Sequence, residues 1–221
     1  MKNKAVTLLC ILTILITTGI VAFADYSNTL PDRVSADETP VADDLIEQIV
    51  SGDIDKELLP GATLNGKVTV NAINADYPAF VRIVVAFEAD RFDSYNSFTE
   101  SIVPTLSESY GWTIHNNWIR IEYENEYYYM TYAVYNEELF NGNAVILKYT
   151  VNMNSKVSNE LVNRLDDGQG YDVLVVTQAT QSNGWTNSNG EITAEDVLDA
   201  AFGELSSINH PWVNSIASND N

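Results

Sequence analysis

The stretch KVTVNAINADYPAFVRIVVAF, residues 67–87, decides the fold class. Its first part, 67–73, alternates polar and apolar residues, which is typical of a strand with one buried face. Its last part, 80–87, is apolar on nearly both sides and indicates a strand covered on both faces, as in the middle of a sandwich. Only the polar break 74–78 separates the two. We therefore expect two strands joined by a short loop and lying as neighbours in one sheet.

The rest of the chain predicts more strands with short helices between them. Further segments rich in β-branched and aromatic residues predict strands at 118–123, 127–135, 144–153 and 171–181. Turns are expected at 136–138 and 141–143. The order favours a mainly β fold of about six or seven strands, a β-sandwich with short inserted helices.

Helices are expected at three places. Segment 41–50 has apolar residues at helical spacing, and 155–165 forms a second candidate. The third begins after Thr193, with Asp196 as the acid of a capping box. Segment 90–110 reads as a helix or an irregular excursion between strands.

The first 24 residues are typical of a cleavable signal peptide. Lys2 and Lys4 precede an apolar run, and the small-residue site Ala22-Phe23-Ala24 is followed by Asp25. An uncleaved membrane anchor is the alternative, because a span needs roughly 20 apolar residues. Cys10 lies inside the apolar run, which argues against lipidation. We expect a secreted protein, extracellular or associated with the cell surface, with no stable membrane anchor after cleavage.

Charge and cysteine content limit the partners. Removing residues 1–24 removes the only cysteine and leaves 9 of 11 basic residues against 31 acidic ones, a formal charge of 9 − 31 = −22. Without thiols the exported chain depends on its core rather than on disulfides. Such a charge repels nucleic acid phosphates, so no nucleic acid partner is expected.

The sequence divides into four parts: 1–24 the signal peptide, 25–40 a polar N-terminal arm, 41–207 a single β-sandwich domain with helices, and 208–221 a flexible tail.

No set of residues predicts catalysis. His115 and His210 are far apart in the sequence, and neither an H-E-x-x-H nor a G-x-S-x-G motif is present. Acidic residues cluster at Glu122, Glu124 and Glu126, whose alternation on one strand would present them on one face, to water or to a hard cation. We expect no catalytic residue.

Segment 185–196 is similar to a calcium loop. Asn187, Asn189 and Asp196 stand at ligand positions, but Trp185 occupies the first position, where an acid is usual. A turn leading into the capped helix explains the same residues, so we expect no cofactor, with Ca²⁺ as the alternative.

Tyrosines are concentrated between positions 123 and 135. Exposed tyrosines bind glycans or proteins, so Tyr127, Tyr128, Tyr129 and Tyr132 form a candidate binding surface. The alternative is that strand alternation divides them between the core and the sheet surface.

The order of segments resembles exported proteins of the TasA/camelysin type, which depend on the signal peptidase SipW. The similar segments are Leu59-Pro60-Gly61, 68–74, Phe80-Val81-Arg82-Ile83, Tyr127-Tyr128-Tyr129, Leu139-Phe140 and 175–184, together with Ala22-Phe23-Ala24-Asp25 at the processing site. The resemblance implies a jelly-roll-like sandwich, secretion, contact with a dedicated signal peptidase, and, in the TasA branch, fibres in which an N-terminal strand is lent to the next subunit. The arm 25–40 departs from the TasA pattern, because it is polar and contains prolines.

Three functions follow from the residues and the resemblance. The first is a structural protein of the cell surface or biofilm matrix that self-associates, assembling into fibres by β-strand addition. The second, implied only by the camelysin relatives, is a secreted metal-dependent peptidase. The third is a surface adhesion or binding module that uses the tyrosines.

Overall fold

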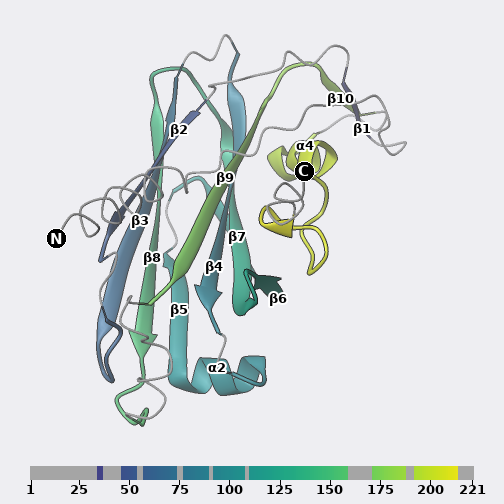
Figure 1. Ribbon diagram of the computed structural model, residues 1–221. Coiled ribbons are helices and arrows are strands. Elements are labelled where there is room, and N and C mark those ends of the chain that lie inside the picture. The colour runs from purple at the N-terminus through teal and green to yellow at the C-terminus, as the bar shows by residue number, and fades with distance from the viewer. Residues whose placement is uncertain are drawn as a thin grey trace, which may run out of the picture.

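The computed structural model describes residues 34–36, 46–53, 57–73, 77–89, 92–107, 110–158, 171–187 and 192–213. Two four-stranded antiparallel sheets pack face to face (Figure 1). The first has the order β2 (Ile46–Gly52), β3 (Thr63–Ala72), β8 (Ala144–Met153), β5 (Ile102–Ser107). The second has the order β6 (Trp112–Tyr123), β7 (Glu126–Leu139), β4 (Ala79–Glu88), β9 (Val173–Gln181). The mainly β sandwich predicted from the sequence is confirmed, with more strands than expected.

Successive strands mostly alternate between the sheets, as in a jelly roll. The chain crosses from one sheet to the other between β3 and β4, β4 and β5, β5 and β6, β7 and β8, and β8 and β9. Among the described strands of the two sheets, β2–β3 and β6–β7 are the successive pairs that stay within one sheet. The prediction that 67–73 and 80–87 are neighbours in one sheet is therefore wrong, because β3 and β4 belong to different sheets.

The remaining elements are short. Helix α2 (Tyr95–Ser101) precedes β5, and helix α4 (Ala194–Phe202) follows β10 (Trp185–Asn187). Strand β1 (Val34–Ala36) pairs antiparallel with β10 in a separate two-stranded ribbon. Among the described residues, no helix is long and apolar enough to cross a membrane.

The core between the sheets is built by strand alternation. Val68 and Val70 of β3 and Ile83, Val85 and Phe87 of β4 are fully buried in it. The Phe87 ring lies 5.8 Å from the Trp118 ring of its own sheet and 6.0 Å from the Tyr149 ring of the other. This cluster joins the two sheets.

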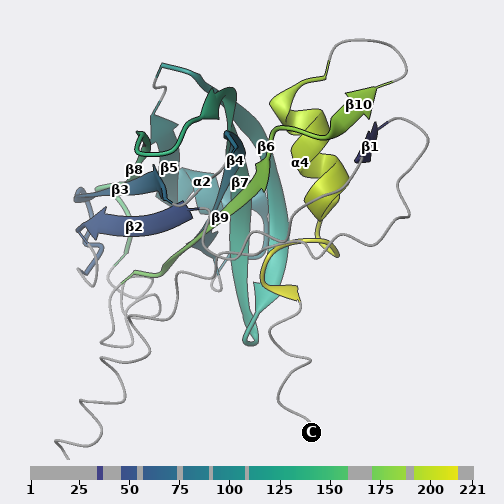
Figure 2. The ribbon, with the colours of Figure 1, turned by 90° about the horizontal axis from the view of Figure 1, so that it is seen from above.

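Strand β4 is buried on both faces, as its apolar sequence predicts. Its second face carries Val84 and Ala86, which pack in a separate cluster with Leu205 and Trp212. Helix α4 lies on the same outer face, on the far side from the β2-β3-β8-β5 sheet (Figure 2). Within the segment 208–221, expected to be a flexible tail, His210 and Trp212 are only 7% and 4% exposed, whereas Ile208 is 84% exposed.

The helix expected at 41–50 is wrong over its described part, because residues 46–52 form β2. Ile46, Gln48 and Val50 alternate inward while Glu47 and Ile49 are exposed, a period of two. The apolar residues of this segment fit a helical period equally well, and pairing with β3 decides between them.

Three other expectations are settled. Residues 136–138 continue β7 instead of forming a turn, whereas a turn forms at 141–142, inside the predicted 141–143. Segment 90–110 contains both α2 and β5 rather than one excursion. The capped helix after Thr193 is confirmed. The helix expected at 155–165 lies mostly outside the described residues.

Candidate functional site

Helix α4 begins at the capping box that the sequence predicts. The Asp196 backbone N–H donates to the Thr193 hydroxyl oxygen at 3.2 Å, and Thr193 donates from its own N–H and its hydroxyl to Asp196 Oδ2 at 3.1 and 2.7 Å. The Asp196 carboxylate therefore accepts hydrogen bonds within the helix cap, and this role explains its position without calcium. Asn187 is in β10, opposite Val34 of β1, and Asn189 lies outside the described residues.

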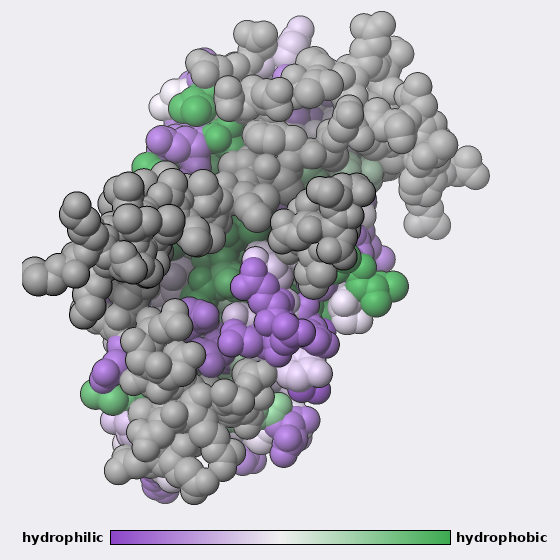
Figure 3. Space-filling view, viewed as in Figure 1, coloured by the Kyte–Doolittle hydropathy of each residue, from purple (hydrophilic) through white to green (hydrophobic). Residues whose placement is uncertain are grey.

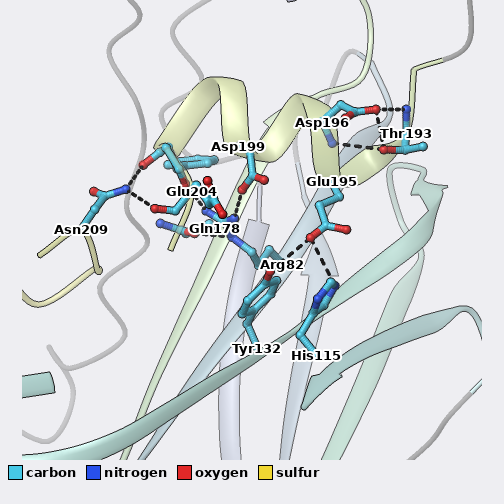
Figure 4. A network of polar contacts seen from close by, with 12 residues as sticks. Arg82, His115, Tyr132, Gln178, Thr193, Glu195, Asp196, Asp199, Glu204 and Asn209 are labelled. Carbon is cyan, nitrogen blue, oxygen red and sulfur yellow. Dashed lines mark hydrogen bonds and ion pairs between the residues drawn. The ribbon is translucent and has the colours of Figure 1, made fainter. Parts of the chain in front are cut away.

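Arg82 is a fully buried charge beneath α4 (Figure 4). Its Nε donates to Gln178 Oε1 at 2.7 Å, its Nη1 donates to Asp199 Oδ1 at 2.6 Å, and its Nη2 donates to the Gly203 carbonyl at 3.3 Å. The guanidinium therefore connects β4, β9 and the C-terminal end of α4. It fixes the helix on the sheet.

Burial opposes both charges of this ion pair. It lowers the pKa of Arg82 and raises the pKa of Asp199, although each partner favours the charged form of the other. Both shifts favour the neutral form of the group, because burial is the largest cause of each. The network therefore holds α4 on the sheet at a cost in desolvation free energy. Removing either Arg82 or Asp199 alone would leave the other charge unpaired.

A second polar group lies beside the first (Figure 4). The Tyr132 hydroxyl donates to Glu195 Oε1 at 3.1 Å, and His115 Nε2 lies 3.3 Å from the same oxygen. The His115 and Tyr132 rings stack with centroids 4.2 Å apart. Burial, followed by the Glu195 charge, raises the pKa of Tyr132, so its hydroxyl remains a donor at neutral pH. This group attaches the first turn of α4 to β6 and β7.

The predicted tyrosine surface is divided between the faces of the sheet. Tyr128 and Tyr129 are 3% and 4% exposed and belong to different clusters, so they are wrong as surface contacts. Tyr127 is partly exposed beneath Arg120, whose Cζ lies 4.0 Å from the ring centroid. The Tyr132 hydroxyl donates its hydrogen bond to Glu195. Strand alternation explains this division, as the alternative predicted.

The acidic residues at 122–126 also separate. Glu122 is the last residue but one of β6, Glu126 begins β7, and Glu124 lies in the two-residue turn between the strands with a φ of 53°. In the described part of the chain, no group of three or more His, Cys, Asp or Glu side chains is placed to hold a metal ion. The signal-cleavage residues Ala22 to Asp25 lie outside the described residues.

Register shows where the edge of β9 presents its backbone. The Glu88 N–H donates to the Asp172 carbonyl and the Ser182 N–H to the Pro78 carbonyl, so even-numbered residues of β9 bond to β4. The odd-numbered residues direct their N–H and C=O groups away from β4. In the described part of the chain, β9 pairs with β4 alone.

Strand β2 presents the facing edge of the other sheet. The Asp53 N–H donates to the Asn65 carbonyl, so odd-numbered residues of β2 bond to β3 and residues 46, 48, 50 and 52 point outward. Gln48 bridges the two edges: its Nε2 donates to the Val175 carbonyl at 3.4 Å, and its Oε1 accepts from the Thr177 hydroxyl at 2.5 Å. Side chains, not a backbone ladder, therefore close this side of the sandwich.

Apolar surface is visible on this side of the sandwich. In the view of Figure 1, recessed apolar surface appears near the middle of the face, in the region between β2 and β9 (Figure 3). Val173, Val175 and Ala179 of β9 and Ile46 and Val50 of β2 contribute to the core behind this edge. An added strand would meet both backbone donors and apolar side chains here.

The two other edges are protected. On β5, the Asn154 N–H donates to the Ser101 carbonyl, which places Pro104 at an outward position without an N–H. On β6, the register shifts between His115 and Ile119, a bulge of the kind that protects an edge. We therefore take the edges of β2 and β9, bridged by Gln48, as the candidate functional site.

Sequence reasoning did not identify Arg82, Gln48 or Thr177. A signal for Arg82 exists, because it is the one charge in the apolar run FVRIVVAF and a buried charge requires partners. Gln48 and Thr177 are 129 residues apart, and no local pattern brings them together.

The buried side chain of His210 makes the free energy of unfolding depend on pH. It is 7% exposed, its Nδ1 has no hydrogen-bond partner among the described residues, and burial lowers its pKa below 6.5. Below pH 6.5 the unfolded chain therefore binds the proton more readily, so the free energy of unfolding should fall as the pH falls. We expect His210→Phe to weaken this dependence in denaturation measured between pH 7.5 and 5. An unchanged slope would contradict it.

Comparisons with known proteins add little. No family model matches the chain, and no curated protein matches it. Among solved structures, AvmM, described as catalysing macrocyclization in alchivemycin A biosynthesis, has a TM-score of 0.34 and 13% identity, covering 52% of this chain and 68% of that chain. A TM-score of this size carries no argument about fold or activity.

Proposed function

We propose that this protein is a secreted structural protein of the cell surface or biofilm matrix, which assembles into fibres by β-strand addition at the edge of β9. Residues 1–24, which have the pattern of a signal peptide, support export. The two-sheet body, with an edge that lacks a strand partner among the described residues, supports assembly. The resemblance to TasA-type proteins agrees with both.

The observation that carries the proposal is the unequal protection of the four edges. Pro104 and the β6 bulge block two of them, whereas β2 and β9 face each other across the Gln48 bridge. Edge strands without a backbone partner are templates for pairing with another chain once they become accessible. The centre of β9 is buried, with Thr177 0% and Ala179 3% exposed, so the added strand would have to displace the Gln48 bridge. Strand addition here would replace two side-chain hydrogen bonds with a backbone ladder, each bond of which contributes about 1 kcal/mol.

A segment of the arm 25–40 already behaves as an added strand. Val34 to Ala36 pair antiparallel with Trp185 to Asn187. The same arm in a second copy is the donor that we propose for the β9 edge. Donation between identical chains in one direction produces an open filament rather than a closed dimer.

Electron microscopy and sedimentation of the secreted chain test the proposal. We expect fibres or a ladder of oligomers at high protein concentration, and loss of assembly when residues 25–40 are removed. A secreted chain that remains monomeric at every concentration would contradict the proposal. Secretion is tested separately by the N-terminal residue of protein recovered from the medium.

A further inference from the structure

Two lysines lie side by side on the outer face of the β2-β3-β8-β5 sheet. Register places Ser51 opposite Lys67, Lys67 opposite Lys148, and Lys148 opposite Ser107, one residue from each strand. Both lysines are exposed. We call these four residues the lysine row. It crosses the whole sheet at right angles to its strands.

The two lysines form a close like-charge pair. The Ala72 N–H donates to the Asn143 carbonyl, so even-numbered residues of β3 bond to β8 and the Lys67–Lys148 pair is a non-hydrogen-bonded one. Side chains approach each other most closely in such pairs, and like charges placed directly opposite are destabilising. An anionic group bound between them would relieve this repulsion.

Two acidic groups on the same face have amide partners. Glu47 accepts a hydrogen bond from Asn71 at 2.9 Å, and Asp53 accepts from Asn65 at 2.9 Å. Among the described residues, no ion pair forms with Lys67 or Lys148. The row therefore presents two positive charges on a chain whose formal net charge is −20.

The chain also carries a complementary acidic feature. Glu122, Glu124 and Glu126 are all exposed at the β6–β7 turn, where Glu124 and Asn125 both have positive φ. The hairpin extends away from the body of the sandwich (Figure 2). The Glu126 carboxylate accepts a hydrogen bond from the Tyr128 hydroxyl at 2.9 Å, so Glu122 and Glu124 are the carboxylates that the tip offers to a pair of ammonium groups.

We propose that the lysine row binds the β6–β7 hairpin tip of a second copy of this chain. The contact joins different surfaces, so it can repeat without closing and can hold neighbouring fibres together. It rests on the proposed function only in taking a second copy as the partner. At physiological salt the repulsion between the acidic bodies is screened beyond about 8 Å, while the close lysine–glutamate contacts persist.

Charge-reversal variants test the contact between the lysine row and the hairpin tip. Lys67→Glu/Lys148→Glu and Glu122→Lys/Glu124→Lys should each weaken salt-sensitive association of the secreted chain by about tenfold or more, measured by sedimentation from physiological to high salt. An equimolar mixture of the two variants should regain it. Glu137→Lys/Glu138→Lys, exposed on β7 away from the tip, and Lys156→Glu are the matched controls and should have little effect.

The outcomes separate this inference from the proposed fibre. If Lys67→Glu/Lys148→Glu forms fibres whose lateral association equals that of the wild type, the inference is overturned while the proposed fibre stands. Salt-sensitive pairs without fibres would support it and contradict strand addition. A row that binds inorganic polyphosphate, with self-association unaffected by Lys67→Glu/Lys148→Glu, would overturn it in favour of a polyanion.

Discussion

Replacing Arg82 with methionine is expected to lower the free energy of unfolding by about 3 kcal/mol, the largest single stability loss that we predict. The change removes three donors at once and leaves Gln178 Oε1, Asp199 and the Gly203 carbonyl without them. Asp199 is 32% exposed and regains some water, which places the loss at the lower end for a broken buried pair. Denaturant unfolding measures it.

A second variant tests this explanation. Arg82→Met/Asp199→Leu removes both charges, and it should recover much of the lost stability because apolar groups replace a costly buried pair. Arg120→Met is the control, since Arg120 is exposed and should cost less than about 1 kcal/mol. If Arg82→Met behaved like Arg120→Met, the clamp on α4 would not be structural.

Replacing Thr177 with proline is expected to abolish fibre assembly while the sandwich still folds. Thr177 is at an odd-numbered position of β9, so its N–H points away from β4. The residue is 0% exposed behind the Gln48 bridge, so an added strand must displace that bridge to reach this amide. Proline removes that donor without breaking the ladder to β4. Sedimentation should show loss of oligomers, by about tenfold or more in association constant, if this amide is at the centre of the contact.

Thr177→Val is the matched control. Both variants lose the hydroxyl that donates to Gln48, but only proline loses the backbone donor. We expect Thr177→Val to assemble at least as well as the wild type, because the Gln48 bridge that closes the edge is weakened. Equal assembly of the proline variant would show that β9 is not the growing edge.

Local patterns predicted most strands because burial repeats along a strand. The run 80–87 is apolar on both faces because the core lies on one side of β4 and α4 with Trp212 lies on the other. The Thr193 cap was also predictable, since both of its members are within four residues. These features depend on neighbours in the sequence.

What the sequence did not predict depends on distant partners. The apolar residues of 46–50 fit a helix and a strand equally well, and only pairing with β3 selects the strand. Crossing of the sandwich between β3 and β4 leaves no local signal. The candidate site combines Gln48 with Val175 and Thr177, which the chain brings together only after both sheets have formed.

Amide hydrogen exchange in the assembled and monomeric forms tests the central claim most directly. If a strand adds to β9, the outward amides of Val173, Val175, Thr177 and Ala179 should become protected on assembly, while the outward Leu106 amide of the Pro104-blocked edge should not change. Assembly without new protection along β9, or with protection at β5 instead, would contradict the account.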